Sequence, residues 1–158
     1  MLGDKKGRKQ DKYVKDYVVF DLETTGTSWV NDAVIEISAV KVKKGKVVDT
    51  FSTLVNPERP IPYRAAEVNH IYYDMVIDAP VFEKALADFD AFVGQNFLVG
   101  HNIHTFDMKF IWRDAEYYWG KTFVNDYIDT LSLARQCLPK LSHHRLVDLA
   151  SYYHISTD

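Results

Sequence analysis

The sequence lacks most of the features that mark specialised classes of protein. It has one cysteine, Cys137, so the chain cannot form an internal disulfide. Its apolar runs are only a few residues long, whereas a membrane-spanning helix needs roughly 20. Repeats are missing, and the chain does not start with the apolar stretch of a secretory signal. We therefore expect a reduced, cytoplasmic protein that makes no contact with a membrane.

An overall excess of basic side chains is missing as well. Lys and Arg number 19 and Asp and Glu 22, which gives a net charge of −3. Residues 1–16 hold six of the basic and three of the acidic side chains, which leaves 13 basic and 19 acidic ones in residues 17–158. We expect residues 1–16 to be a flexible basic leader. An acidic remainder can still meet a polyanion where its carboxylates hold divalent cations.

The remaining composition is that of an ordinary globular protein, and residues 17–158 are expected to form one domain. Residues 17–20 form a short apolar run that stops at Asp21 and predicts a buried strand. Residues 33–43 and 47–55 alternate apolar and polar side chains across a Lys-Gly-Lys turn. This pattern predicts an antiparallel hairpin beside the first strand.

From residue 80 onward the apolar period becomes helical, with compact strands between the helices. The expected elements are helices at 82–93, 106–118, 130–137 and 144–153, and strands at 97–100 and 127–128. A hairpin followed by helix crossovers predicts an α/β fold with a mixed sheet and helices on its faces. In such sheets the carboxyl ends of the crossover strands meet at a shared crevice, where ligands bind.

Three carboxylates are expected near this crevice. Asp21 and Glu23 follow the first strand two residues apart, so their side chains point to the same side. Asp107 begins a helix soon after the strand that ends at residue 100. Solvated strand-end acids and a helix cap are the structural alternatives. If the three converge, they form an all-oxygen site suited to Mg²⁺ or Mn²⁺.

Two segments resemble the first two motifs of the DnaQ-like 3′→5′ exonucleases, whose metal ligands are Asp-Glu-Asp-Asp. They are residues 19–26, Val-Phe-Asp-Leu-Glu-Thr-Thr-Gly, and residues 99–107, which begin Val-Gly-His-Asn and end Phe-Asp. Residues 69–71, 79–82 and 129–135 continue the pattern, so that the resemblance covers nearly all of 17–155. Its nearest form is the proofreading exonuclease region of a bacterial DNA polymerase III, of the epsilon or PolC type.

The resemblance implies a ribonuclease-H-like fold and two-metal hydrolysis of a terminal phosphodiester. Asp21, Glu23 and Asp107 would be the catalytic residues and would hold two divalent cations, Mg²⁺ or Mn²⁺. The substrate would be a single-stranded or frayed 3′ end of DNA, and a replicative polymerase subunit is a candidate partner. The implied substrate-binding residues are Thr24 at the terminal nucleotide, Ile71 as an apolar wedge against the terminal base, and His101, Asn102 and Phe106 in the second motif.

The second motif departs from the family's form, because His-Asn-Ile-His-Thr-Phe-Asp is one residue longer than usual. We align it on Phe106 and Asp107, since an apolar helix face follows them. This makes the role of Asp107 firmer than those of His101 and His104.

The family's closing motif, His-Arg-Ala with an Asp five residues after the His, is expected to be absent. Residues 143–148 reproduce its spacing, but we interpret them as part of an earlier helix. Leu146, Leu149 and Tyr153 are expected to form a packed face of that helix, and His144 and Asp148 an ordinary surface pair. On this interpretation the 158-residue form has impaired activity.

Two other functions stay open from the sequence alone. One is a non-catalytic nucleic-acid-binding or polymerase-docking module with the same fold, and the other is an exoribonuclease of the same family. Most aromatic side chains are expected in the core. Trp29, in the loop after the first motif, is the candidate for stacking on a base.

Overall fold

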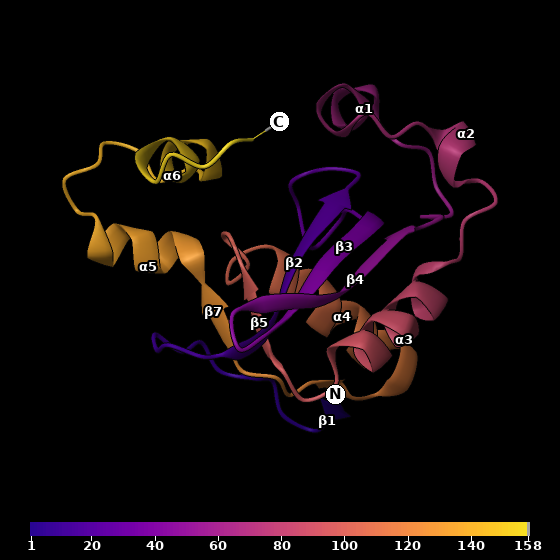
Figure 1. Ribbon diagram of the computed structural model, residues 1–158. Coiled ribbons are helices and arrows are strands. Elements are labelled where there is room, and N and C mark those ends of the chain that lie inside the picture. The colour runs from indigo at the N-terminus through magenta and orange to yellow at the C-terminus, as the bar shows by residue number, and fades with distance from the viewer. Residues whose placement is uncertain (158) are drawn as a thin grey trace.

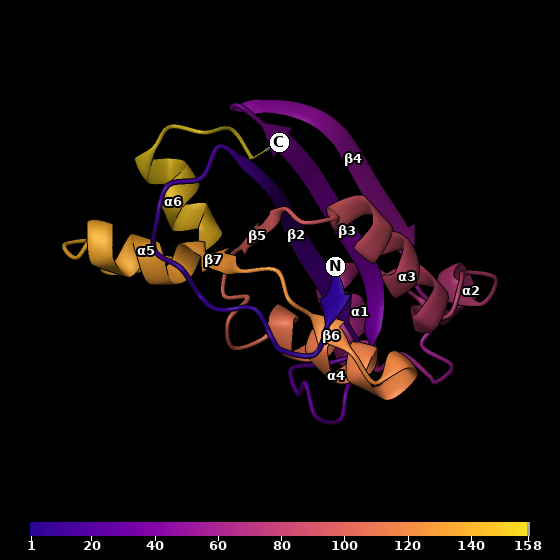
Figure 2. The same ribbon diagram turned by 90° about the horizontal axis from the view of Figure 1, so that it is seen from below.

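A mixed five-stranded sheet runs through the centre of the molecule in the computed structural model, which describes residues 1–157 (Figure 1). The strand order is β4-β3-β2-β5-β7, and the twist of the sheet is visible from below in Figure 2. The strands are β2 (Asp16–Thr24), β3 (Val34–Lys43), β4 (Lys46–Leu54), β5 (Phe97–Gly100) and β7 (Tyr127–Asp129). β2, β3 and β4 pair antiparallel, whereas β5 lies parallel to both β2 and β7. The predicted mixed α/β sheet and its antiparallel hairpin are thereby confirmed.

β2 is longer than the sequence pattern predicts. Its ladder with β3 continues past Asp21, which lies opposite Ser38, to Glu23, which lies opposite Glu36. A register shift follows between Glu23 and Thr24. The acidic residues therefore belong to the strand itself, so that their direction is set by the pleat of the sheet.

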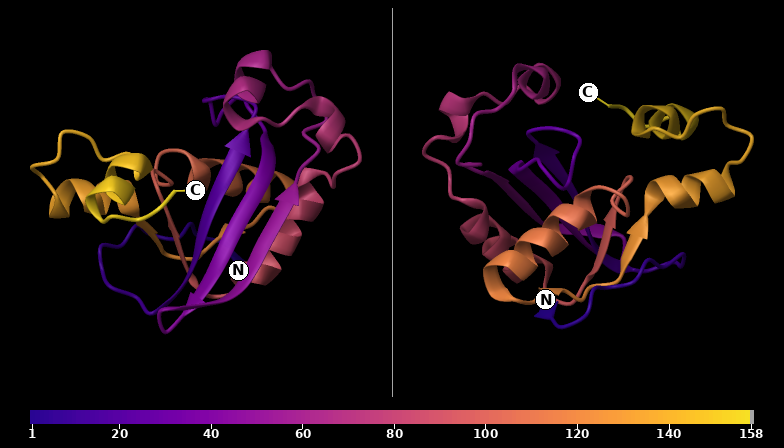
Figure 3. Two further views of the ribbon diagram at one scale, coloured as in Figure 1. Left: turned by 45° about the horizontal axis from the view of Figure 1, so that its top comes forward. Right: turned by 180° about the vertical axis from the view of Figure 1, so that it is seen from behind.

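Two helices pack on one face of the sheet and build the core with it (Figure 3). They are α3 (Phe82–Val93) and α4 (Asp107–Trp119). The side chains of Phe89 and Phe110 are completely buried among those of Val18 and Phe20 on β2. This core fixes α4, and with it Asp107, against the inner face of β2.

The other helices lie around the edge at which β2 ends. Figure 1 shows α1 (Tyr63–Asn69) and α2 (Tyr73–Val76) on one side of that edge. On the other side lie α5 (Thr130–Cys137) and α6 (Leu146–Tyr152). The sequence pattern missed α1 and α2, because both are short and α1 has no side-chain cap at its start.

The N-terminal segment, which the composition predicts to be a flexible leader, makes backbone contacts with the rest of the chain. β1 (Leu2–Gly3) pairs antiparallel with β6 (Thr122–Phe123). Further along, the amide of Gln10 donates to the carbonyl of Tyr127 at 2.8 Å. The open edge of β7 supplies backbone partners for this segment, and composition alone does not reveal such partners.

The packed face that Leu146, Leu149 and Tyr153 are expected to form on α6 is only partly present. Leu146 is 61% exposed and Tyr153 is 56% exposed, and no α6 side chain is fully buried. Together with Leu133 on α5, Leu146 and Tyr153 border an apolar groove. The helix is present as predicted, at Leu146–Tyr152, but of the three residues only Leu149 is partly buried, so the predicted packing is formed only in part.

Within residues 1–157, every helix is too short or too polar to cross a lipid bilayer.

Candidate active site

The end of β2 presents two carboxylates on the side of the sheet opposite the core. Val18, Phe20 and Leu22 are buried, whereas the alternate residues Asp21 and Glu23 are exposed or half-buried. This is the period-two arrangement that the sequence predicts. Both acids therefore share one side of the strand end.

Asp107, 4% exposed, reaches the same strand end from the first turn of α4. Its Oδ2 accepts a hydrogen bond from the backbone amide of Leu22 at 3.0 Å. Leu22 lies between Asp21 and Glu23, so this bond brings a third carboxylate to the edge that carries the other two. A simple helix cap is the structural alternative for this position, and the observed bond ties Asp107 to the sheet as well.

Burial raises the pKa of all three carboxyl groups, and the charge of Asp21 adds to this effect at Glu23 and Asp107. Burial, and then the charge of Asp21, raise the pKa of Asp107 to about 7. Burial and the charges of Asp21 and Glu36 raise the pKa of Glu23, and burial raises the pKa of Asp21. In residues 1–157 no Lys or Arg forms an ion pair with any of these groups. The edge therefore favours a bound cation or proton.

Glu36 is a further acidic residue that the sequence analysis did not select. It lies directly opposite Glu23 in the β2–β3 ladder, and burial and Asp21 raise its pKa. In the sequence Glu36 is only one of the polar positions in the alternation of residues 33–43, so the pattern does not mark it as a site residue. Its register with Glu23 becomes visible only when the pairing of the strands is known.

The donor set fits a hard divalent cation, since carboxylate oxygens are its preferred protein ligands. As the side chains lie, no three His, Cys, Asp or Glu residues within 1–157 form a group tight enough to hold a metal ion. The carboxylates share an edge without forming a complete ligand shell. The metal-binding role of Asp21, Glu23 and Asp107 therefore stays a prediction.

The predicted substrate loop is joined to the end of β2. The Asn69 side-chain amide donates to the Thr24 carbonyl at 3.3 Å, and the Asn69 side-chain oxygen accepts from the Ile71 amide at 3.0 Å. The Thr24 hydroxyl donates to the Gly26 carbonyl. Ile71 is 4% exposed and packs in a small apolar cluster with Ile35. As placed, Ile71 anchors this loop and offers little surface to a base, so its wedge role stays a prediction.

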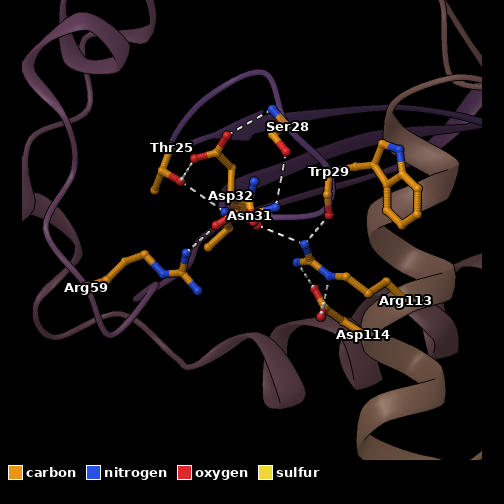
Figure 4. Close-up of polar contacts among 9 residues, drawn as sticks. Thr25, Ser28, Trp29, Asn31, Asp32, Arg59, Arg113 and Asp114 are labelled. Carbon is orange, nitrogen blue, oxygen red and sulfur yellow. Dashed lines mark hydrogen bonds and ion pairs between the residues drawn. The ribbon is translucent and has the colours of Figure 1, made fainter.

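The loop between β2 and β3 is held from α4 by Arg113 (Figure 4). The Arg113 guanidinium donates to the carbonyl of Trp29 and to that of Asp32, the latter at 2.9 Å, and it pairs with Asp114 at 2.8 Å. Inside the loop, the Asp32 carboxylate accepts from the Thr25 hydroxyl at 3.1 Å. The same helix thus positions Asp107 and the loop that follows Glu23.

Gly26 and Trp29 are two further positions that shape this loop. A Cβ at Gly26 would lie 2.5 Å from the Asp32 carboxylate, so position 26 has no room for a side chain while the Thr25 hydroxyl and the Ser28 amide hold that carboxylate in place. The ring of Trp29 lies beside α4, with the Lys109 ammonium 5.9 Å from its centre (Figure 4). Trp29 is 39% exposed, and its stacking role stays a prediction.

The second motif forms a loop whose polar groups bind mainly to neighbouring parts of the chain. The His101 ring contacts the Thr130 hydroxyl at 2.9 Å and the His144 carbonyl at 2.8 Å. Asn102 adopts a left-handed backbone with φ of 61°. Phe106 packs edge-on against Phe110. These contacts support the loop that leads to Asp107, and direct substrate contacts by His101, Asn102 and Phe106 stay predictions.

The prediction that His144 and Asp148 form a surface pair is wrong. Asp148 binds Arg145 instead, accepting from its backbone amide at 2.9 Å and from its guanidinium Nε at 2.9 Å. His144 contacts the Leu138 carbonyl at 2.7 Å. Arg145 precedes the first turn of α6 and Asp148 lies within it, so Arg145 offers two kinds of donor to this carboxylate.

The sequence matches a known family over most of its length. The profile of the RNase T family, described as "Exonuclease", matches residues 18–158. The PolC-type DNA polymerase III of Clostridium perfringens is 42% identical over 149 residues, and that of Bacillus subtilis is 41% identical over 145 residues. These matches cover 94% and 88% of the chain. The chain spans about 10% of the length of either polymerase.

The fold also matches solved structures. Exonuclease X in complex with 5′ overhanging duplex DNA superposes with a TM-score of 0.70 and 26% identity, covering 90% of this chain and 75% of that one. A structure of exonuclease I superposes with a TM-score of 0.76 at 17% identity, covering 90% of this chain and 36% of that one. The second likeness concerns the fold alone.

Proposed function

This chain belongs to the RNase T exonuclease family, and from that premise we propose that it removes nucleotides from the 3′ end of a DNA strand. The observation that carries the proposal is the bond between Asp107 and the Leu22 amide, which joins three carboxylates at one strand end. Enzymes of this family use divalent metal ions. We propose that Asp21, Glu23 and Asp107 hold two such ions, Mg²⁺ or Mn²⁺.

Bound there, the ions would supply an activated water and stabilise charge on the phosphodiester. The chain's own residues would form the rest of the site. The turn from Thr24 to Gly26 would receive the terminal nucleotide, because it directly follows Glu23 and admits no side chain at Gly26. The loop tied to it by Asn69 would form the wall on the other side.

The PolC-type relatives support DNA as the substrate and a replicative polymerase as the assembly in which the chain acts. Exonuclease X, whose structure contains a DNA duplex, supports the same substrate class. On this basis proofreading is the proposed role. The exoribonuclease and the non-catalytic module are the competing functions, and the following assay separates all three.

The test is a nuclease assay with a single-stranded DNA that carries a label at its 5′ end, in the presence of Mg²⁺. The proposal expects a ladder of products that shorten from the 3′ end, formed slowly because residues 143–148 are not expected to act as the family's closing motif, with Asp107→Asn inactive. A 5′-labelled RNA of the same sequence is the second substrate. Faster degradation of RNA would favour the exoribonuclease. Binding of DNA without any product, at all Mg²⁺ and Mn²⁺ concentrations, would favour the non-catalytic module.

The same assay bears on residues 143–148. We propose that His143 and Asp148 are not the family's closing residues, because Asp148 is already bound to Arg145. Activity of the 158-residue chain that disappears in Asp148→Asn would contradict this.

A further inference from the structure

Asp129 is a buried carboxylate with more hydrogen-bond partners than a helix cap requires. It is the last residue of β7, it precedes α5, and it is 3% exposed. Its Oδ1 accepts from the amides of Leu131 at 2.9 Å and Ser132 at 3.4 Å, as an N-cap residue does. Its remaining bonds leave the helix altogether.

These additional bonds hold the loop of the second motif. Oδ1 accepts from the Asn102 amide at 3.0 Å, and Oδ2 accepts from the His104 amide at 2.9 Å. The two donors lie 27 and 25 residues before Asp129 in the sequence. One carboxylate thus joins the end of β7 to the loop that follows β5.

The loop has a shape that these bonds maintain. Asn102 is left-handed, with φ of 61°, a conformation that asparagine adopts more readily than other residues with a side chain. The Thr105 hydroxyl closes the turn by donating to the Asn102 side-chain oxygen at 2.8 Å. The loop then leads directly into α4, whose first residue is Asp107. Any change in the loop therefore moves the start of that helix.

A second contact from the junction between β7 and α5 also holds this loop in place. Thr130, next to Asp129, holds the His101 ring through its hydroxyl at 2.9 Å. The junction thus forms hydrogen bonds with the loop at His101, Asn102 and His104, and three attachment points restrict the loop more than one would.

We propose that Asp129 is a positioning residue of the site: by holding the Asn102 and His104 amides, it fixes the loop that places the Asp107 carboxylate beside Asp21. The inference rests on the proposed nuclease function for its kinetic consequence, but its geometric content is independent of that function. In this proposal Asp129 acts through the loop and Asp107, because its hydrogen bonds all go to backbone amides.

A carboxylate is required because both of its oxygens must accept. An asparagine has one acceptor oxygen, and its amide nitrogen would face the N–H group of Asn102 or His104. Asp129→Asn therefore removes at least one of the two hydrogen bonds to the loop, with almost no change in side-chain volume. Asp129→Ser retains an N-cap oxygen for α5, but its shorter side chain does not reach the loop.

The experiment compares Asp129→Asn with Asp126→Asn in the full chain. Asp126 is the matched control, because it lies just before β7 and its carboxylate accepts from the Arg8 amide at 2.8 Å, away from the loop. Three quantities are measured for each variant: hydrogen exchange of the Asn102 and His104 amides, the Mn²⁺ concentration that half-saturates the rise in the unfolding midpoint, and kcat and KM on single-stranded DNA.

In Asp129→Asn we expect faster exchange at both amides and a 10- to 100-fold weaker apparent affinity for Mn²⁺, which is about the cost of losing a residue that orients a metal ligand. We expect kcat to fall by about 10²-fold with KM changed less than about threefold, because the variant misplaces the Asp107 carboxylate and leaves the residues that bind the substrate unchanged. Asp126→Asn should match the wild type in all three.

Two results would overturn the inference. One is a folded Asp129→Asn with wild-type exchange at both amides. The other is fast exchange with unchanged Mn²⁺ affinity and kcat, which would make Asp129 a structural cap only. If Asp129→Asn does not fold, Asp129→Ser takes its place under the same criteria. A wild-type chain that neither responds to Mn²⁺ nor cuts DNA contradicts the proposed function instead, and the exchange data still decide whether Asp129 holds the loop.

Discussion

The carboxylate of Asp107 accepts a hydrogen bond from the backbone amide of Leu22, 85 residues earlier in the chain, at 3.0 Å. Leu22 faces the core, whereas Asp21 and Glu23 on either side of it face away. One bond therefore connects the first turn of α4 to the middle of an acidic pair. Burying Asp107 beside Asp21 opposes its ionisation, so the site is built at a cost in stability that function has to explain.

Asp107→Asn should separate the activity of the site from the stability of the fold. The amide oxygen can still accept from Leu22, but the buried acidic group is gone. We expect nuclease activity to fall by about 10³-fold or more. The free energy of unfolding without added metal should stay equal or rise by about 1 kcal/mol. Urea denaturation at pH 7 measures the second quantity, with the exposed Asp88→Asn on α3 as control. A loss of several kcal/mol would show that Asp107 is mainly structural.

Arg113→Lys should loosen the loop after the first motif. The guanidinium reaches the carbonyls of Trp29 and Asp32 and the Asp114 carboxylate together, whereas an ammonium lacks this planar fork. We expect a loss of about 1–3 kcal/mol in unfolding free energy and faster proteolysis within residues 27–31. Arg64→Lys on the exposed surface of α1 is the control. Equal proteolysis rates in the two variants would argue against this role of Arg113.

Glu36→Gln should stabilise the protein in the absence of divalent ions. Glu36 lies opposite Glu23 in the ladder and near Asp21, and like charges placed so are unfavourable. We expect an increase of about 0.5 kcal/mol in unfolding free energy, and a smaller increase at high salt. The comparison is with Glu67→Gln on α1. A destabilised Glu36→Gln would mean that the carboxylate has a favourable role in the fold.

The N-terminal segment should be protected from hydrogen exchange. The amides of Gly7 and Gln10 donate to the carbonyls of Phe123 and Tyr127 at 3.1 and 2.8 Å. We expect both to exchange at least tenfold more slowly than the same amides in a peptide of residues 1–16. Peptide-like rates at both positions would restore the flexible leader that composition predicted.

Much of the fold and part of the site could be predicted from the sequence. The alternation of residues 33–43 and the helical period of 82–93 gave the right elements, because each has one face in the core. The assignment to DnaQ-like exonucleases, made from residues 19–26 and 99–107, is confirmed by the family match. Local patterns and motif order carry this kind of information.

The remainder depends on contacts between distant parts of the chain. Nothing near Arg113 in the sequence indicates that it holds the carbonyls of Trp29 and Asp32. Asp129 is visible as a potential helix cap, but its bonds to the Asn102 and His104 amides are not. Likewise the resemblance implies Ile71 as a wedge against the terminal base, but it does not reveal that Ile71 is buried beside Ile35 of β3.

A titration with Mn²⁺ followed by thermal unfolding tests whether Asp21, Glu23 and Asp107 act together as a divalent-cation site. A cation that binds only the folded chain raises the unfolding midpoint as its concentration grows. We predict a saturable rise in the wild-type chain that is absent in Asp107→Asn and in Asp21→Asn, and intact in Asp88→Asn. The same response in all four proteins, or in none, would contradict it.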